Sequence, residues 1–90
     1  MVTEMPEIIV YTSEPCSFCT RAKRLLEKKG VTFREIFIRR DDWEARARIA
    51  EITGHYTVPQ VIVDGTPIGG WDDLAALERA GRLDEILLAA

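Results

Sequence analysis

The feature that most constrains this chain is a strand–helix–strand succession near its start. Residues 7–11 are rich in β-branched side chains and follow Pro6, as expected of a short buried strand. Residues 17–29 repeat apolar side chains at helical spacing, and Gly30 follows as a helix stop. Residues 31–38 alternate in polarity like a second strand. Such a unit is right-handed and pairs its strands in parallel, so it predicts a sheet with a helix on one face.

The remaining sequence predicts a second helix, a hairpin and a final helix. Residues 41–54 begin with two aspartates, which cap helices well, and end at a glycine. Residues 58–70 are typical of two strands joined by an Asp-Gly turn, and residues 71–90 of a helix interrupted or capped at Gly81. The order βαβαββα predicts an α/β protein with a four-stranded mixed sheet flanked by helices, the thioredoxin-like fold. We expect a single domain over residues 1–90.

Composition and charge argue against several classes of protein. The chain of 90 residues has a net charge of −3, whereas nucleic-acid modules usually carry a basic excess. No apolar run approaches the ~20 residues of a spanning helix, so we expect no membrane segment. The N-terminal stretch lacks the basic region of a signal peptide. We therefore expect a cytoplasmic protein, in a compartment that keeps thiols reduced.

Cys16 and Cys19 are the only cysteines of the chain, and two residues separate them. A structural disulfide between them would close a very short loop and would stabilise the fold little. A zinc site needs four ligands, whereas the sequence offers two cysteines and the distant His55, which we interpret as a loop residue. We therefore expect no protein-only metal site and interpret the two cysteines as a redox pair.

The expected position of the two cysteines gives them unequal roles. If the helix begins at Ser17, Cys16 is its N-cap, where free backbone N–H groups and the helix dipole favour the thiolate. Cys19 follows one turn later, deeper and at the start of the apolar face. We therefore expect Cys16 to attack a disulfide and Cys19 to resolve the mixed disulfide that forms.

Two further stretches are compatible with a substrate site. Pro59 stands at the start of a predicted strand, where its missing N–H is tolerated, as in many ordinary strands. Gly69 and Gly70 come shortly before Asp72 and Asp73, at the start of a predicted helix whose N–H groups can hold a carboxylate. Simple helix capping by the two aspartates explains the same residues equally well.

Three motifs in register resemble the glutaredoxins, in particular the small bacterial dithiol class, here as a Cys-Ser-Phe-Cys variant. The motifs are YTxxxCxxCxxAKxLLxxKG, TVPQVxxDG and IGGxDDLxAL, and the similarity extends over nearly the whole chain. The resemblance implies the thioredoxin-like fold, a cis Val58–Pro59 bond and glutathione as co-substrate. It also implies an enzyme, a glutathione-dependent thiol–disulfide oxidoreductase that reduces protein disulfides and glutathione mixed disulfides.

The resemblance also assigns roles to individual residues. Cys16 is implied as the nucleophile and Cys19 as the resolving thiol. Arg46 falls where the family has a basic or amide residue that reaches the glycine carboxylate of glutathione, although a solvated helix face explains it too. The implied partners are glutathione and disulfide-bonded or glutathionylated proteins, with the chain itself a monomer. The implied glutathione site comprises Thr12, Cys16, Phe18, Arg46, Thr57, Val58, Pro59, Gly70, Trp71, Asp72 and Asp73.

Ser13, Phe18 and Trp71 depart from the family pattern. Ser13 replaces a common lysine that helps to bind glutathione and to hold the thiolate. This loss weakens glutathione affinity and thiolate stabilisation unless Arg21 or Lys23 compensates for it. Phe18 lacks the hydroxyl of the usual tyrosine, and Trp71 is bulkier than the usual small residue.

Ser17 is a fourth departure and leaves an alternative open. It replaces the usual proline and is similar to members that hold a [2Fe-2S] cluster between two subunits, with Cys16 and glutathione as ligands. The first alternative is therefore such a cluster-binding dimer. The second is a redoxin that serves ribonucleotide reductase and is recycled by thioredoxin reductase, against which Arg46 and the GGWDDL motif favour glutathione.

Overall fold

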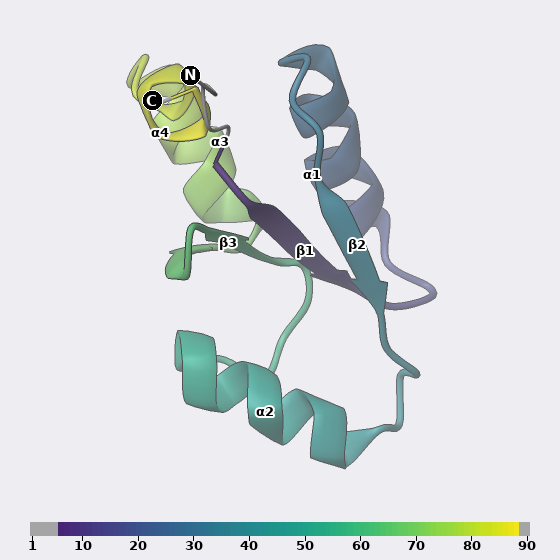
Figure 1. The fold of residues 1–90 in the computed structure, drawn as a ribbon. Helices are drawn as coiled ribbons and strands as arrows, with labels where there is room; N and C mark the ends of the chain where they lie inside the picture. The colour runs from purple at the N-terminus through teal and green to yellow at the C-terminus, as the bar shows by residue number, and fades with distance from the viewer. Residues whose placement is uncertain (1–5, 89–90) are drawn as a thin grey trace.

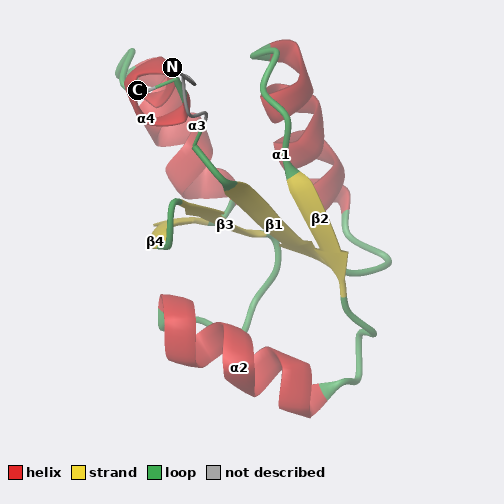
Figure 2. Cartoon of the chain, viewed as in Figure 1, coloured by secondary structure: helices red, strands yellow, loops and turns green. Residues whose placement is uncertain are grey.

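The computed structural model describes residues 6–88 and shows one mixed sheet between two helical layers. In chain order the elements are β1 (Ile8–Thr12), α1 (Ser17–Lys28), β2 (Arg34–Phe37), α2 (Trp43–Thr53), β3 (Gln60–Val63), β4 (Thr66–Gly69), α3 (Trp71–Arg79) and α4 (Leu83–Leu87). Helices α1, α3 and α4 cover one face of the sheet, and α2 covers the other (Figure 1). The strand order is β2-β1-β3-β4, with β1 and β2 parallel and the other neighbours antiparallel (Figure 2).

This arrangement confirms the predicted four-stranded mixed sheet with helices on both faces. The final helix is divided in two, so the observed order has one helix more than the predicted one. The division falls at Gly81, whose φ of 72° ends α3 in the left-handed conformation that glycine adopts most readily. The chain then turns and begins α4 at Leu83.

Strand β2 is shorter than the predicted strand over residues 31–38. Parallel pairing aligns Ile9 with Arg34, so Val31 in the same register would face Pro6, which has no N–H to donate. The Val31 N–H instead bonds the carbonyl of Leu26 and completes the end of α1. The first residue of the predicted strand therefore forms its backbone hydrogen bond with the end of α1 rather than with the sheet.

The hairpin of β3 and β4 forms at the predicted turn. Asp64 and Gly65 both have positive φ, at 49° and 81°. Two consecutive positive φ values define the type I′ turn that matches the twist of antiparallel strands, and Asp-Gly is one of its preferred pairs. The turn places β4 at the edge of the sheet and starts α3 immediately after it.

The apolar core has two parts, one on each face of the sheet. The smaller lies under α2, where Ile38, Ala45 and Ile49 pack with residues of β1 and β2. Alternating side chains of β1 point to opposite faces of the sheet, so this strand contributes to both parts. The larger part lies under the other three helices and comprises Ile8, Val10, Ala22, Leu26, Val31, Val61, Val63, Leu74, Leu83 and Leu87.

Lys29 joins the three helices of one layer. Its ammonium lies 2.6 Å from a carboxylate oxygen of Glu78 in α3 and 2.8 Å from one of Asp84 in α4, directly after the end of α1. The hydrogen bonds to Asp84 and then Glu78 raise the pKa of Lys29 above its ordinary 10.5. A raised pKa means that the ion pairs stabilise the fold fully below pH 10.5, and that this stability is lost as the pH rises through the pKa of the folded state.

We therefore expect Lys29→Met to lower the urea midpoint of unfolding at neutral pH, because two carboxylates lose their cation. Lys28→Met is the matched control, since the exposed Lys28 makes no ion pair with another described residue. Urea unfolding followed by far-ultraviolet circular dichroism measures both. Equal midpoints for the two variants would show that the ion pairs of Lys29 with Glu78 and Asp84 contribute nothing to the stability of the fold.

Candidate functional site

Cys16 and Cys19 form a disulfide at the amino end of α1. Cys16 is the N-cap of the helix, and its Sγ accepts a hydrogen bond from the backbone N–H of Cys19 at 3.0 Å. Cys16 is half-buried, whereas Cys19 is 2 % exposed. An incoming sulfur can therefore reach Cys16 more easily, and a thiolate formed there keeps an N–H donor and the positive end of a helix dipole beside it.

A groove, here called the α3 groove, runs from Cys16 to the amino end of α3. It consists of two adjoining cavities of about 370 and 360 Å³ that share Phe18, Thr57 and Val58. The Sγ of Cys16 lies 3.9 Å from the carbonyl oxygen of Val58, so the disulfide and the wall of the groove are in contact. The predicted site residues that line it are Cys16, Phe18, Arg46, Thr57, Val58, Pro59, Gly70, Trp71, Asp72 and Asp73.

The segment before β3 forms one wall of the α3 groove. The Val58–Pro59 peptide bond is cis, as the resemblance implies. Gln60 follows, 2 % exposed, and its Nε2 donates to the hydroxyl of Thr57 at 3.3 Å, while its Oε1 has no partner among the described residues. Gln60 lines the groove but is absent from the predicted site. The sequence feature that could have indicated Gln60 as a site residue is its position next to Pro59, at the start of a buried strand.

The start of α3 forms the opposite wall. The Asp73 carboxylate accepts a hydrogen bond from the backbone N–H of Gly70 at 3.0 Å, which is half of a capping box. A methyl group on Gly70 would lie 3.1 Å from the carbonyl oxygen of Pro59, so the two walls already approach closely. The first N–H groups of a helix have no intrahelical partner and suit a bound carboxylate.

Arg46 reaches the groove from α2 and is already engaged with the backbone. Its Nε donates to the carbonyl of Arg40 at 2.9 Å and its Nη1 to the carbonyl of Tyr56 at 2.8 Å. Its guanidinium also lies over the ring of Trp43, 5.6 Å from the centroid. A guanidinium has five N–H donors, so Arg46 can hold these loops and still present donors to an anion.

Thr12 lies on the other side of the disulfide, away from the α3 groove. It is 1 % exposed, and its hydroxyl donates to the Glu35 carboxylate at 2.6 Å. Lys23 lies 3.1 Å from the same carboxylate, so its charge is paired there rather than placed in the groove. These three residues line a further cavity of about 580 Å³, which Cys19 also lines and which adjoins the α3 groove at Ser13, Pro15, Cys16 and Ser17.

The environment of Glu35 predicts how the stability of the fold changes in acid. The Thr12 hydroxyl, followed by Lys23, lowers the pKa of Glu35 below its ordinary 4.5. A lowered pKa stabilises the fold above pH 4.5, and this stability is lost as the pH falls through the pKa of the folded state. Urea midpoints from pH 7 to pH 3 should therefore fall less steeply for Glu35→Gln than for the unaltered protein.

Glu51→Gln is the control for that measurement, because the exposed Glu51 of α2 makes no ion pair with another described residue. Its midpoints should follow those of the unaltered protein over the whole range. Parallel curves for Glu35→Gln and Glu51→Gln would contradict the assigned pKa shift.

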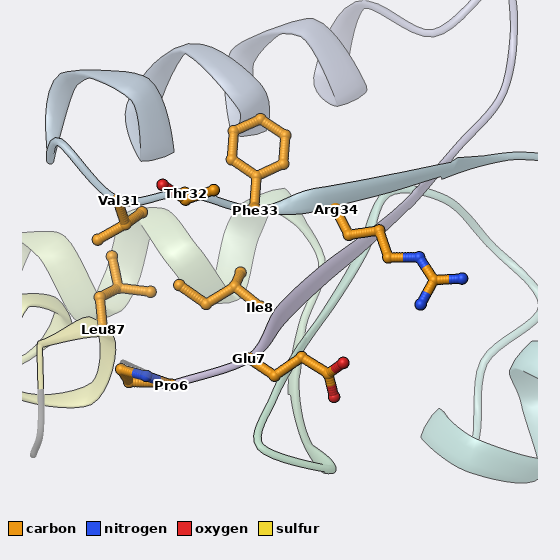
Figure 3. A pocket seen from close by; sticks show the side chains of 8 residues that line it. All are labelled: Pro6, Glu7, Ile8, Val31, Thr32, Phe33, Arg34 and Leu87. Atoms are coloured by element: carbon orange, nitrogen blue, oxygen red, sulfur yellow. The ribbon is translucent and has the colours of Figure 1, made fainter. Parts of the chain in front are cut away.

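An apolar cavity at the opposite end of the sheet does not belong to this site. It has a volume of about 330 Å³ and lies where β1 and β2 begin, whereas the disulfide follows the end of β1. Ile8, Val31 and Leu87 converge in it, while the charged ends of Glu7 and Arg34 point away (Figure 3). Neither cysteine lines it.

Residues 6–88 contain no group of three or more His, Cys, Asp or Glu side chains arranged to hold a metal ion. His55 lies in the loop between α2 and β3 and is exposed, as predicted. A [2Fe-2S] cluster would therefore need ligands from outside the described chain, as the resemblance implied. Within residues 6–88, no helix has both the length and the hydropathy to span a membrane.

Comparisons with known proteins match this chain to one family. Residues 8–68 match the glutaredoxin family. A glutaredoxin of Pseudomonas aeruginosa is 49% identical over 85 residues, covering 94% of this chain and all of that one. Glutaredoxin 3 of Escherichia coli K12 is 45% identical over 85 residues, covering 92% and 99%. The likeness therefore extends over nearly the full length of both relatives.

Solved structures agree with the sequence relatives. The solution structure of glutaredoxin from Brucella melitensis has a TM-score of 0.82 and 42% identity, covering 96% of this chain and 92% of that one. The crystal structure of a buckwheat glutaredoxin–glutathione complex has a TM-score of 0.81 and 30% identity, covering 91% and 76%. These likenesses confirm the thioredoxin-like fold.

Proposed function

The chain belongs to the glutaredoxin family and is a thiol–disulfide oxidoreductase; on this premise we propose that glutathione is its reductant. Its substrates are protein disulfides and glutathione mixed disulfides. The observation that carries the proposal is the α3 groove, which starts at the more accessible sulfur of the pair and ends at the N–H groups of the first turn of α3. Two adjoining cavities of about 370 and 360 Å³, with Arg46 beside one and the start of α3 beside the other, suit an extended tripeptide with a carboxylate at each end.

The reaction begins with the thiolate of Cys16. In the reduced protein this thiolate attacks the glutathione sulfur of a mixed disulfide, so that a Cys16–glutathione bond forms and the substrate sulfur leaves as a thiolate that takes a proton from water. The Cys19 N–H, 3.0 Å from Sγ, stabilises the attacking thiolate and is part of the helix end.

Two routes then regenerate the reduced protein. A second glutathione thiolate can attack the glutathione sulfur on Cys16, which releases glutathione disulfide and restores the Cys16 thiolate. Alternatively, Cys19 attacks Cys16 and displaces the bound thiol, leaving the intramolecular disulfide seen in the structure. Two further glutathione molecules reduce that disulfide.

The groove supplies a partner for each end of glutathione. Arg46 offers guanidinium N–H groups to the glycine carboxylate near Cys16. The N–H groups at the start of α3 donate to the γ-glutamyl carboxylate, and the exposed carboxylate of Asp72 faces the neighbouring ammonium. The backbone of Val58 lies between them, beside the reacting sulfur.

A coupled assay tests this proposal. The protein is supplied with a glutathionylated peptide and, as electron source, either glutathione with glutathione reductase or thioredoxin reductase alone. We expect turnover that requires glutathione and saturates with the glutathionylated substrate. Equal turnover with thioredoxin reductase alone would overturn glutathione dependence and favour the redoxin alternative.

A further inference from the structure

The disulfide faces a second hollow, here called the β2 cleft, on the side away from the α3 groove. Its first cavity, of about 580 Å³, lies between α1 and β2 and contains both Cys16 and Cys19. A second cavity of about 540 Å³ shares Glu14 and Phe37 with the first and extends to Trp43. Cys19 lines the β2 cleft but not the α3 groove. Cys16, which lines both hollows, can thus be approached from two sides, of which glutathione needs one.

The side chains of the β2 cleft combine exposed aromatics with unpaired polar groups. Phe37 is 53 % exposed and Trp43 68 %, although large aromatic side chains are normally buried. The hydroxyl of Ser13 is buried between the cleft and the groove and has no hydrogen-bond partner among the described residues. Exposed aromatic residues beside polar groups are typical of protein-binding surfaces.

The sheet leaves this side open. Strand β2 is at the edge of the sheet, so its outer N–H and C=O groups have no strand partner. Phe37 is its last residue, at the end of the strand nearest the disulfide. Extended peptides commonly bind at such open edges.

We infer that the β2 cleft binds the polypeptide chain next to the substrate cysteine, with a bulky apolar side chain of that polypeptide packed against Phe37. The inference rests on the proposed attack by Cys16 on a disulfide. Net charge does not select the partner, because Lys23 is paired with Glu35, Arg39 with Asp41, and the charge of Arg40 is balanced by that of Glu14. The cleft therefore distinguishes substrates by the apolar residue near the cysteine, and glutathione, which has none, occupies the α3 groove.

Single-turnover reduction tests this inference without glutathione. Pre-reduced protein is mixed with a synthetic peptide that carries one disulfide and a leucine two residues from each cysteine, or with hydroxyethyl disulfide. Acid quenching, alkylation and mass spectrometry then give the rate at which the Cys16–Cys19 pair becomes oxidised. We expect Phe37→Ser to slow the reaction with the peptide about tenfold, as a lost apolar anchor does, and the reaction with hydroxyethyl disulfide less than about twofold.

Three controls make the comparison specific. Ile52→Ser changes an apolar side chain of similar exposure, 46 %, that lines neither hollow, and should leave both rates unchanged. Phe37→Tyr keeps the ring and should react with the peptide at the original rate. A peptide with serine in place of leucine should react equally with the unaltered protein and with Phe37→Ser, because the contact is then absent on both sides.

Three results would overturn the inference: equal slowing of both substrates by Phe37→Ser, no slowing of either, or equal rates of the unaltered protein with the leucine peptide and the serine peptide. Because glutathione is absent from the reaction, these outcomes are independent of the glutathione assay. A protein that fails the glutathione assay and still shows the Phe37 effect would contradict the proposed reductant only.

Discussion

Cys16→Ser is expected to lose at least ~10³-fold of its activity toward glutathionylated substrates, because removal of a nucleophile removes the reaction path itself. Cys19→Ser is expected to keep most of that activity. Cys19 is buried and is needed only to close the intramolecular disulfide, whereas glutathione can resolve the Cys16 adduct directly. The measurement is the initial rate of deglutathionylation under glutathione reductase coupling, for the two variants side by side.

The same pair of variants separates the two classes of substrate. The Cys19→Ser substitution should slow the reduction of a peptide disulfide much more than that of a glutathionylated peptide. Without Cys19, the mixed disulfide between Cys16 and the peptide can be resolved only by glutathione. Circular dichroism of both variants serves as the control for folding. Equal losses in Cys16→Ser and Cys19→Ser on glutathionylated substrate would contradict the separate roles assigned to the two sulfurs.

Gly69→Ala is expected to weaken both the fold and the α3 groove. Gly69 has a φ of 124°, and a methyl group there would overlap the carboxylate of Asp73. The strained backbone should lower the free energy of unfolding by ~1–3 kcal/mol. Displacement of Asp73 should break its bond to the Gly70 N–H, move the start of α3 and raise the KM for glutathione about tenfold.

Gly81→Ala is the matched control for this variant. Gly81 also has a positive φ, of 72°, but a methyl group there would meet open space, and it is remote from the groove. Its cost should be that of a left-handed alanine alone, ~1–2 kcal/mol, with an unchanged KM for glutathione. Urea unfolding and steady-state kinetics measure the two effects. A KM that rises equally in both variants would show that instability, rather than the groove, controls glutathione binding.

Local sequence signals predicted most of the fold because they act over a few residues. The N-cap position of Cys16 followed from a helix that begins at Ser17, and the hairpin followed from Asp64 and Gly65. The predicted start of β2 was wrong because the true start depends on how β2 aligns with β1, and in that register Val31 would face a proline. Such a register is a long-range property that local sequence does not determine.

The surroundings of the cysteines were less predictable for the same reason. Thr12 was assigned to the glutathione site from its place in a motif, yet its side chain lies on the side of the β2 cleft, where it meets Glu35 from another strand. The β2 cleft itself needs α1, β2 and the segment before α2 to come together, and no spacing in the sequence indicates that. The α3 groove was more accessible to prediction because each of the three motifs contributes residues that line it.

The most direct test of the central claim is to trap the intermediate. The reduced Cys19→Ser variant is mixed with glutathione disulfide, quenched in acid, digested and mapped by mass spectrometry. The account predicts one glutathione per chain, bound to Cys16, and its removal on addition of excess glutathione. No adduct on Cys16, or an adduct that excess glutathione does not remove, would contradict the account.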